Sequence, residues 1–393
     1  MHRIRNIVFV LITLTAIAGC HFNKEKHNNS SPSPVEEIEE QKQTQEIIEE
    51  PQVVVTSATV AAVGDVLIHG SIYKDAYTGD TYDFDKMFTE VKPYLEETDI
   101  TFANQESMIG GKEIGLSTYP RFNSPFEVGD ALQRAGVDVV SMANNHTLDH
   151  GEKAIMNAIN HWDSLDVAYV GAYKNTEDRN EVRTLEKNDI TFAFLAYTYG
   201  TNGIPVPEEK PYLVNLIDKK QIEADISASK QEADVIVVSL HFGDEYERMP
   251  SEEQRELVQF VADKGAHLII GHHPHVLQPV EYIKSELGHD AFVIYSLGNF
   301  LAAQEAKHDH FRRIGGILQV QIEKTQRGDE STIRILSPSF LLTYIYFTNW
   351  KNYAILPLKE VTNNELPNAK QHYEEMKAHL SQYVPDLDFM ENE

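Results

Sequence analysis

Carboxylate, amide and imidazole side chains recur in this 393-residue sequence at the ends of short apolar runs. Imidazole nitrogen and carboxylate oxygen suit zinc, manganese and iron, whereas a thiolate-type zinc site is excluded because no Cys lies among these residues. The five groups are Asp65 and His69; Asn104 and Glu106; Asn144, Asn145, His146 and Asp149; His241; and Gly271, His272, His273 and His275. The pattern predicts one metal centre assembled from five places in the chain.

The elements that must position these side chains are buried strands. Apolar runs bounded by glycine and polar residues are typical of strands in a parallel sheet, and ligands gather beyond the carboxyl ends of such strands. Helix-like periodicity separates the runs, and paired strands follow Pro279. We therefore expect a layered α/β/β/α sandwich. The expected strands include 58–63, 100–103, 137–142, 234–240 and 267–270, and the expected helices 84–97, 125–135, 151–164, 218–231, 251–264 and 363–383.

The chemistry of such a centre follows from its donors. Two metals about 3.5–4 Å apart, bridged by a carboxylate, would activate a water and hold a phosphate-like oxyanion. Asn145 beside His146 offers a ligand and a neighbouring general acid. His273-Pro274-His275 is expected to form an extended loop that presents two imidazoles on one side.

The N-terminus predicts export. Residues 1–19 combine early positive charge with an apolar stretch that is too short for a mature membrane span, and they precede Cys20. The segment Ile17-Ala18-Gly19-Cys20 resembles a bacterial lipobox, which implies lipidation of Cys20 and a lipid anchor on the extracytoplasmic face of the cell membrane. An uncleaved signal anchor is the alternative. Residues 20–56 are expected to form an acidic disordered tether.

The formal net charge is −27, and it becomes more negative when the predicted signal peptide with Arg3 and Arg5 is removed. This balance argues against nucleic acid as a partner and against electrostatic adhesion to anionic lipid. An anionic substrate would need a local basic or metal-bearing pocket, because the overall field of the protein repels it.

Six segments together resemble the CapA-type capsule-synthesis family, which acts in poly-γ-glutamate biosynthesis and is similar in fold to calcineurin-like metallophosphoesterases. The segments are GDVLIHG, ANQES, SMANNHTLDHG, SLHFGDEY, GHHPHVLQPVE and YSLGNF. The resemblance spans about residues 58–305. It implies a family domain at 57–345, followed by a C-terminal helical extension at 346–393, and a capsule-synthase membrane complex as partner.

Roles for individual residues follow from the resemblance alone. It implies His146 as the acid that protonates a leaving group, and substrate contacts from Arg121, Asn104 and Asn299. The implied ligands of one or two ions of manganese, zinc or iron are Asp65, Glu106, Asn145, His241, His273 and His275. His69, His272 and Asp149 are expected to support the ligands or the fold.

The sequence also departs from the phosphoesterase pattern. His69 stands four residues after Asp65 instead of two, and Asn104-Gln105-Glu106 replaces a Gly-Asp pair. Three functions stay open: support of synthesis or export of an anionic capsule polymer, metal-dependent hydrolysis of a cell-envelope phosphoester, and non-catalytic polymer binding as a scaffold.

Overall fold

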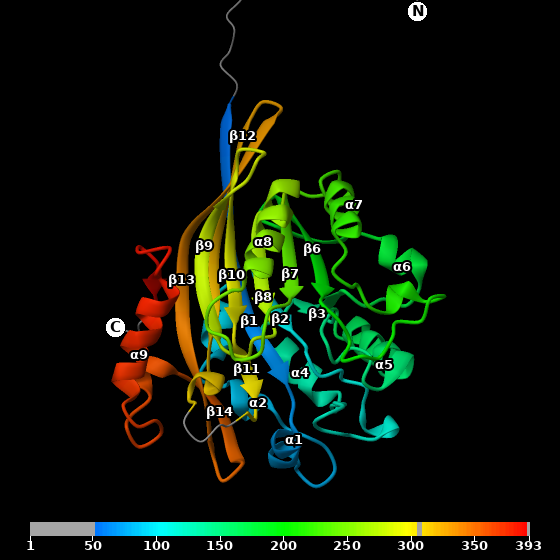
Figure 1. Ribbon diagram of the computed structural model, residues 1–393, viewed down its shortest axis with the longest axis vertical. Coiled ribbons are helices and arrows are strands. Elements are labelled where there is room, and N and C mark those ends of the chain that lie inside the picture. Colours follow the sequence, from blue (N-terminus) through cyan, green and yellow to red (C-terminus); the bar gives the residue numbers. More distant parts are fainter. Residues whose placement is uncertain (1–51, 305–308, 391–393) are drawn as a thin grey trace, which may run out of the picture. The chain divides into compact units, whose positions relative to one another are not determined.

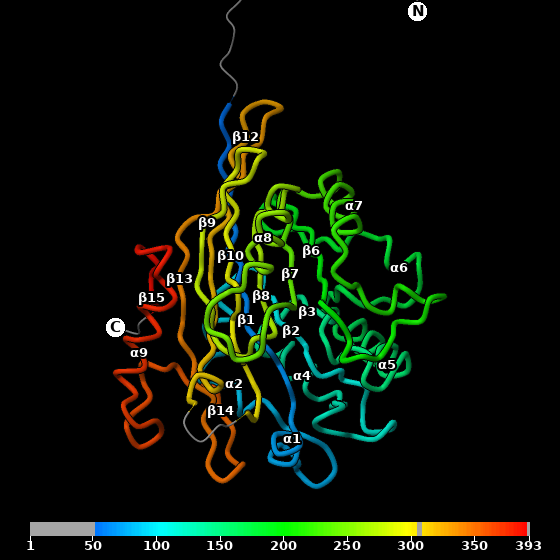
Figure 2. Tube along the Cα trace, viewed as in Figure 1, coloured from blue at the N-terminus to red at the C-terminus, as the bar shows by residue number. Residues whose placement is uncertain are grey.

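Two β-sheets lie face to face in the computed structural model, which describes residues 52–304 and 309–390 (Figure 1). Helices cover the outer face of each sheet, and the path of the chain can be followed along the trace in Figure 2. The expected α/β/β/α sandwich is confirmed. The predicted signal peptide, Cys20 and nearly all of the predicted tether lie outside the described residues.

The first sheet has the order β14-β13-β12-β1-β2-β3-β4, with β11 paired to β1 and β15 paired to β13. β1 to β4 run parallel, and the long strands β12 and β13 run antiparallel beside them. The strands are β1 (Val53–Leu67), β2 (Ile100–Asn104), β3 (Val139–Ser141), β4 (Ala168–Val170), β11 (Asn299–Ala302), β12 (Ile314–Arg327), β13 (Glu330–Thr348), β14 (Lys351–Pro357) and β15 (Asp388–Phe389).

The second sheet has the order β5-β6-β7-β8-β10-β9. Its four central strands are parallel, and they are almost wholly apolar and buried, as a sheet covered on both faces requires. The strands are β5 (Arg183–Lys187), β6 (Ile190–Thr198), β7 (Val235–His241), β8 (Leu268–His272), β9 (Leu277–Lys284) and β10 (Asp290–Leu297).

Helices form the two outer layers. The longest helices bury an apolar stripe, as expected. The ends of α8 are also marked in the sequence: the helix begins at a capping box of Ser251 and Gln254, and it ends at Gly265, whose φ of 118° suits glycine. The helices are α1 (Gly70–Ala76), α2 (Asp85–Phe88), α3 (Lys92–Glu96), α4 (Glu127–Arg134), α5 (Gly151–Ser164), α6 (Thr176–Asn180), α7 (Lys219–Ser229), α8 (Glu252–Lys264) and α9 (Ala369–Leu380).

One hydrophobic core lies between the sheets. Phe102 of β2 stacks on Phe194 of β6 with ring centroids 6.2 Å apart, and Ile294 of β10 is fully buried in the same cluster. Separate clusters join each sheet to its outer helices, for example around Trp162 of α5 and Val258 of α8. Both sheets are therefore fixed from two sides, which holds the ends of their strands in place.

Three predicted boundaries need correction. The tether was predicted to run to residue 56, but residues 53–56 already belong to β1 and pair with β12. The helix expected at 84–97 is two short helices, α2 and α3, and Pro93 stands in the first turn of α3, where proline is tolerated. The C-terminal segment 346–393 contains the expected helix as α9, but it also holds the end of β13 and all of β14. Because these strands pair within the first sheet, 346–393 does not form a separate helical extension.

No helix within residues 52–304 and 309–390 has the length and apolar character that a membrane span requires.

Candidate metal centre

The predicted ligands meet at one end of the two sheets. Asp65 lies near the end of β1, Glu106 follows β2, and Asn145 follows β3. From the second sheet, His241 ends β7 and pairs in register with His272, the last residue of β8. Because parallel strands point their carboxyl ends to the same edge, five segments that are distant in sequence reach one place.

A local irregularity places Asp65. The register shifts on both sides of this residue, between β1 and β2 and between β1 and β11. Such a bulge redirects a side chain that would otherwise follow the alternation of the strand. Gly64 permits the close backbone contact beside it, since a Cβ there would lie 2.0 Å from the Gly298 carbonyl oxygen. The Asp65 amide donates to that same oxygen at 2.9 Å.

The Asp65 carboxylate is fully buried and holds several partners. Its Oδ1 accepts from Asn104 Nδ2 at 2.8 Å, and its Oδ2 lies 3.1 Å from His275 Nδ1 and 3.4 Å from the amide nitrogen of His273. His272 Nδ1 is 3.4 Å from Oδ1. Asp65 therefore fixes the His272–His275 segment directly.

His275 has its two ring nitrogens in different surroundings. Nδ1 donates toward Asp65 and toward Asn299 Oδ1 at 3.0 Å, while Nε2 lies 3.7 Å from Glu106 Oε1. This is the carboxylate–histidine arrangement that fixes the tautomer and the ring orientation of a metal ligand. In this structure Nε2 of His275 is the nitrogen available to a metal.

The His273–His275 loop is not the extended segment that the sequence predicts. His273 has a φ of 99° and His275 a φ of 59°, both in the left-handed region that side chains other than glycine rarely adopt. Their ring centroids are 6.0 Å apart. Non-glycine residues held this way cost about 1–3 kcal/mol each and cluster at functional sites. The two imidazoles still reach the same centre, but through a strained turn.

Glu106 supplies the test of whether the residues fit a metal. Its carboxylate is completely buried, and neither oxygen has a hydrogen-bond partner among the described residues. One oxygen of Glu106 and one ring nitrogen each from His273 and His275 lie within 4.8 Å of one another. An uncompensated buried carboxylate is costly unless a cation meets it. These three residues therefore fit a divalent ion.

His241 and Asn145 form the adjoining half of the centre. His241 Nε2 donates to Asn145 Oδ1 at 2.9 Å and lies 3.7 Å from Glu106 Oε1. Asn104 Nδ2 approaches His241 Nδ1 at 3.3 Å while it also donates to Asp65. Glu106 therefore stands between His275 on one side and His241 on the other, the position expected of a bridging carboxylate.

Burial and charge set the protonation of the metal-free centre. Burial raises the pKa of Glu106 well above its ordinary value, and neighbouring Asp65 adds to this despite His275. Burial would also raise the pKa of Asp65, but the hydrogen bonds and charges of His272 and His275 outweigh this effect and hold the pKa of Asp65 well below its ordinary value. Burial lowers the pKa of His275, but Glu106 and Asp65 outweigh it and raise that pKa to about 9.

The other two histidines favour the neutral form. Burial, helped by the charge of His275, lowers the pKa of His273 to about 3. Burial and the neighbouring His273 lower the pKa of His241 well below its ordinary value. Neutral imidazole is the form that binds a metal.

His146 is held by a carboxylate beside the centre. Its Nδ1 donates to Asp149 Oδ2 at 2.7 Å, and the same oxygen accepts from the Phe122 amide at 2.7 Å. The Phe122 ring meets the His146 ring edge-on, with centroids 4.7 Å apart. This contact fixes the imidazole and leaves Nε2 for proton exchange with a bound group.

The three residues that the resemblance assigns to substrate occupy different places. Asn104 and Asn299 are fully buried and hydrogen-bonded to Asp65 and His275, so their amides position ligands in this structure. The Arg121 side chain is exposed, next in sequence to Phe122. Of these three, only Arg121 is placed to meet a large ligand from outside.

His69 and His272, which the sequence analysis expects to support the ligands or the fold, have contacts of different kinds. His69 Nδ1 lies 3.0 Å from the Leu67 carbonyl oxygen, and burial lowers the pKa of His69 to about 4. The His272 ring is fully buried and stacks on Phe102 at 6.2 Å.

Two residues that the sequence reasoning did not single out also contact the centre. Asn202 Oδ1 accepts from Asn145 Nδ2 at 3.3 Å, and Tyr199 packs on His273 with ring centroids 4.7 Å apart. Tyr199 directly follows β6, so the strand-end rule could have found it. Asn202 lies in the loop beyond and carries no such signal.

A divalent ion held by these ligands would supply Lewis-acid polarisation of an oxyanion and a bound water of lowered pKa. Among the chain's own residues, Asp65, Asn104 and Asn299 would hold the ligands in orientation, and His146 would supply a proton donor or acceptor.

Comparison with known proteins shows the family to which the chain belongs. The model of the family described as bacterial capsule synthesis protein PGA_cap matches residues 59–304, which include all the predicted ligands. The chain is 32% identical over 260 residues to the capsule biosynthesis protein CapA of Bacillus anthracis, covering 63% of this chain and 60% of that protein. It is 29% identical over 252 residues to the PGA biosynthesis protein CapA of Bacillus subtilis, covering 62% of each.

Both alignments span less than two thirds of the relative's own length. Among solved structures, a putative 5'-nucleotidase from Staphylococcus aureus aligns with 81% of this chain and 58% of its own, at 16% identity and a TM-score of 0.41. The family match covers more than half of the chain and rests on the segments that carry the site. The chain belongs to the bacterial capsule synthesis protein PGA_cap family.

Proposed function

We propose that this protein is tethered to the extracytoplasmic face of the cell membrane and supports synthesis or export of an anionic capsule polymer of the poly-γ-glutamate type. Family membership and the two relatives named for capsule and PGA biosynthesis support the polymer class. The proposal includes one or two divalent ions of manganese, zinc or iron, held by the predicted ligand set.

The observation that carries the metal part is Glu106. A buried carboxylate with two unpartnered oxygens, flanked by His241, His273 and His275, is destabilising as it stands and becomes favourable once a cation is bound. A structural role alone gives no reason to keep a negative charge at this position.

The tether part rests on the sequence before the described residues. Lipidation of Cys20 would supply the membrane hold, and an acidic spacer would keep the folded domain away from the surface. Assembly with a membrane-bound polymer synthase would bring the pocket to the growing or emerging chain.

The test is genetic complementation. In a capsule-forming cell that lacks this gene, we expect the wild-type chain to restore cell-associated polymer and Glu106→Gln to restore less than about a tenth of it. His289→Gln is the matched control, because His289 lies between β9 and β10 and contacts Ser285 and Ala266, outside the centre. Full polymer with Glu106→Gln and His273→Ala would overturn the metal part and leave a scaffold.

A second function, hydrolysis of a cell-envelope phosphoester, is favoured by one observation. The His146–Asp149 pair stands next to the ligand cluster with the geometry of a general acid held by a carboxylate. Purified full-length protein would be assayed on phosphomonoesters and phosphodiesters with added manganese. Turnover that His146→Ala reduces by about 10²–10⁴-fold supports this function, and no turnover in the metal-loaded wild type excludes it for those substrates.

A further inference from the structure

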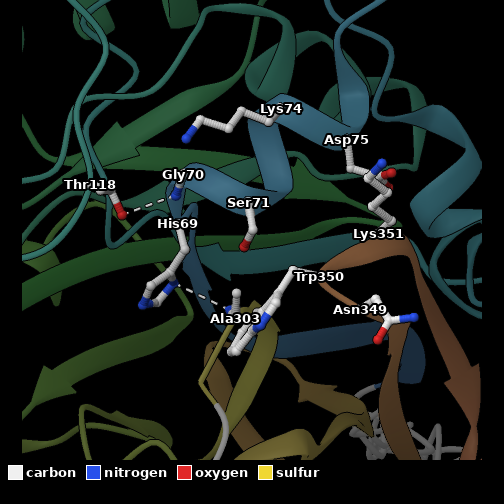
Figure 3. Close-up of a pocket in the computed structure, with 10 residues that line it drawn as sticks. All are labelled: His69, Gly70, Ser71, Lys74, Asp75, Thr118, Ala303, Asn349, Trp350 and Lys351. Carbon is white, nitrogen blue, oxygen red and sulfur yellow. Dashed lines mark hydrogen bonds between the residues drawn. The ribbon is translucent and has the colours of Figure 1, made fainter.

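A cavity lies between α1 and the turn that joins β13 to β14 (Figure 3). Its volume is about 640 Å³, within the range of about 300–1,000 Å³ that ligand pockets take. Its lining combines two lysines, a tryptophan and small polar side chains. The residues that the argument uses are His69, Lys74, Asp75, Trp350 and Lys351.

The positive charge of this cavity is not neutralised within the described parts of the chain. Lys74 and Lys351 form no ion pair there, although acidic residues outnumber basic ones almost two to one in the protein. Asp75, the only acidic residue of the lining, already has partners: Lys86 Nζ at 3.7 Å and the Tyr353 amide at 3.0 Å. Two lysines therefore stay available to an anionic ligand.

Trp350 adds an apolar wall. Its side chain is 46% exposed and stacks on Phe347, with ring centroids 5.1 Å apart and an interplanar angle of 19°. Asn349 and Trp350 have φ values of 52° and 59°, the paired left-handed conformation of a tight hairpin turn. The turn thus holds a large aromatic ring at the cavity, and Figure 3 draws this ring next to Ala303 in the view.

A short aromatic path links this cavity to the metal centre. His69 lines the cavity and meets Phe122 edge-on, with ring centroids 5.1 Å apart. Phe122 in turn contacts His146 at 4.7 Å. The ring of Phe122 therefore lies between His69 at the cavity and His146 at the centre, and it contacts both.

We propose that this cavity is a subsite for a carboxylate-bearing oligomer, whose carboxylates meet Lys74 and Lys351 and whose methylene groups pack on Trp350. A γ-linked glutamate chain has this alternation of charge and aliphatic spacing. The inference rests on the proposed function and specifies how a strongly acidic protein holds an acidic chain. Screening by salt weakens such contacts, so binding falls as ionic strength rises.

The experiment measures the dissociation constant of a fluorescently labelled, short γ-linked oligoglutamate for the full-length protein. Lys74→Gln/Lys351→Gln should weaken binding by roughly tenfold, the effect of losing two exposed charge contacts. The control Lys220→Gln/Lys370→Gln makes the same charge change on α7 and α9, outside the cavity, and should bind like the wild type. Trp350→Asn should weaken binding as well, because it removes the apolar wall. Asn is chosen because it tolerates the left-handed conformation of the turn.

Each result is decisive. Equal weakening of binding by both lysine pairs would show a general charge effect and overturn the subsite. Unchanged binding in Lys74→Gln/Lys351→Gln would overturn the subsite as well. In both cases the proposed function stands. Stronger lysine-dependent binding of an oligophosphate overturns the carboxylate assignment. A wild-type protein that binds no oligoglutamate at all overturns the subsite and also the polymer class of the proposed function. Unchanged thermal unfolding shows that each variant is folded.

Discussion

Asp65 and Glu106 are both buried carboxylates, yet their surroundings give them opposite effects on stability. Asp65 is compensated by Asn104, His272 and His275, whereas both Glu106 oxygens lack hydrogen-bond partners among the described residues. The first carboxylate therefore organises the metal-free protein, and the second weakens it until a cation arrives.

Isosteric neutral variants should separate these two roles. For metal-free protein in a chelator, we expect Asp65→Asn to lower the free energy of unfolding by about 3–5 kcal/mol, because it leaves His275 facing an amide. Glu106→Gln should change it by less than about 1 kcal/mol or raise it, since a buried carboxyl group whose oxygens have no hydrogen-bond partner among the described residues is replaced by a neutral amide. Denaturant titration measures both, with Glu90→Gln as an exposed control. Equal losses from the two variants would contradict the assignment.

Metal affinity should increase with pH. The pKa of His275 is raised to about 9, so this imidazole carries a proton near neutral pH when no metal is bound, and burial raises the pKa of Glu106 as well. Metal binding must release the His275 proton, and it becomes easier as pH approaches 9. Calorimetry in buffers of different ionisation enthalpy should detect the release. An affinity that is flat or falls between pH 6.5 and 9 would contradict it.

The strand-end pattern predicted that five groups of side chains meet, and the family resemblance selected six of these side chains as ligands. Asp65, Glu106, Asn145, His241, His273 and His275 lie together as expected. The direction of each ring nitrogen could not be predicted, because it depends on the bulge at Asp65 and on the left-handed turn at His273 and His275. Neither feature has a signature in a single sequence.

At the scale of elements, close backbone contact between β1 and the loop before β11 holds the centre. A Cβ at Gly64 would meet the Gly298 carbonyl oxygen at 2.0 Å, so Gly64→Ala must push the two segments apart. We expect a loss of about 1–3 kcal/mol in unfolding free energy, and weaker metal binding because Asp65 moves.

Gly200→Ala is the matched control, since no atom would contact a Cβ at that position. Thermal unfolding and metal titration of both variants give the answer. A Gly64→Ala protein that matches Gly200→Ala in both measurements would show that the contact does not position Asp65.

Strands and helices could be predicted from the sequence where an element is buried along its whole length, on one side or on both. Apolar runs such as that of β7 and the capping box of α8 predict their elements directly. The prediction was wrong for the C-terminal segment, because the run 353–357 of β14 is apolar throughout and shows no alternation of polar and apolar residues in the sequence. The place of β14 in the sheet depends on pairing with β13, a contact made only in the folded chain.

At the scale of the whole molecule, the strongly acidic surface and the proposed lipid anchor belong together. A net charge of −27 opposes attraction to anionic lipid, so electrostatic attraction would not supply the membrane attachment proposed above. We expect Cys20→Ser to move the protein from the membrane fraction to the soluble extracytoplasmic fraction and to reduce capsule polymer. Fractionation with immunodetection measures this, and an unchanged membrane share in Cys20→Ser would contradict lipidation.

The most direct test of the account is the metal content of purified full-length protein after exposure to manganese, zinc and iron. We predict that the wild type retains one or two divalent ions through gel filtration and that Glu106→Gln and His273→Ala lose them, with His289→Gln unchanged. A wild-type protein that retains none of the three metals, and whose unfolding temperature does not respond to them, would contradict the central claim.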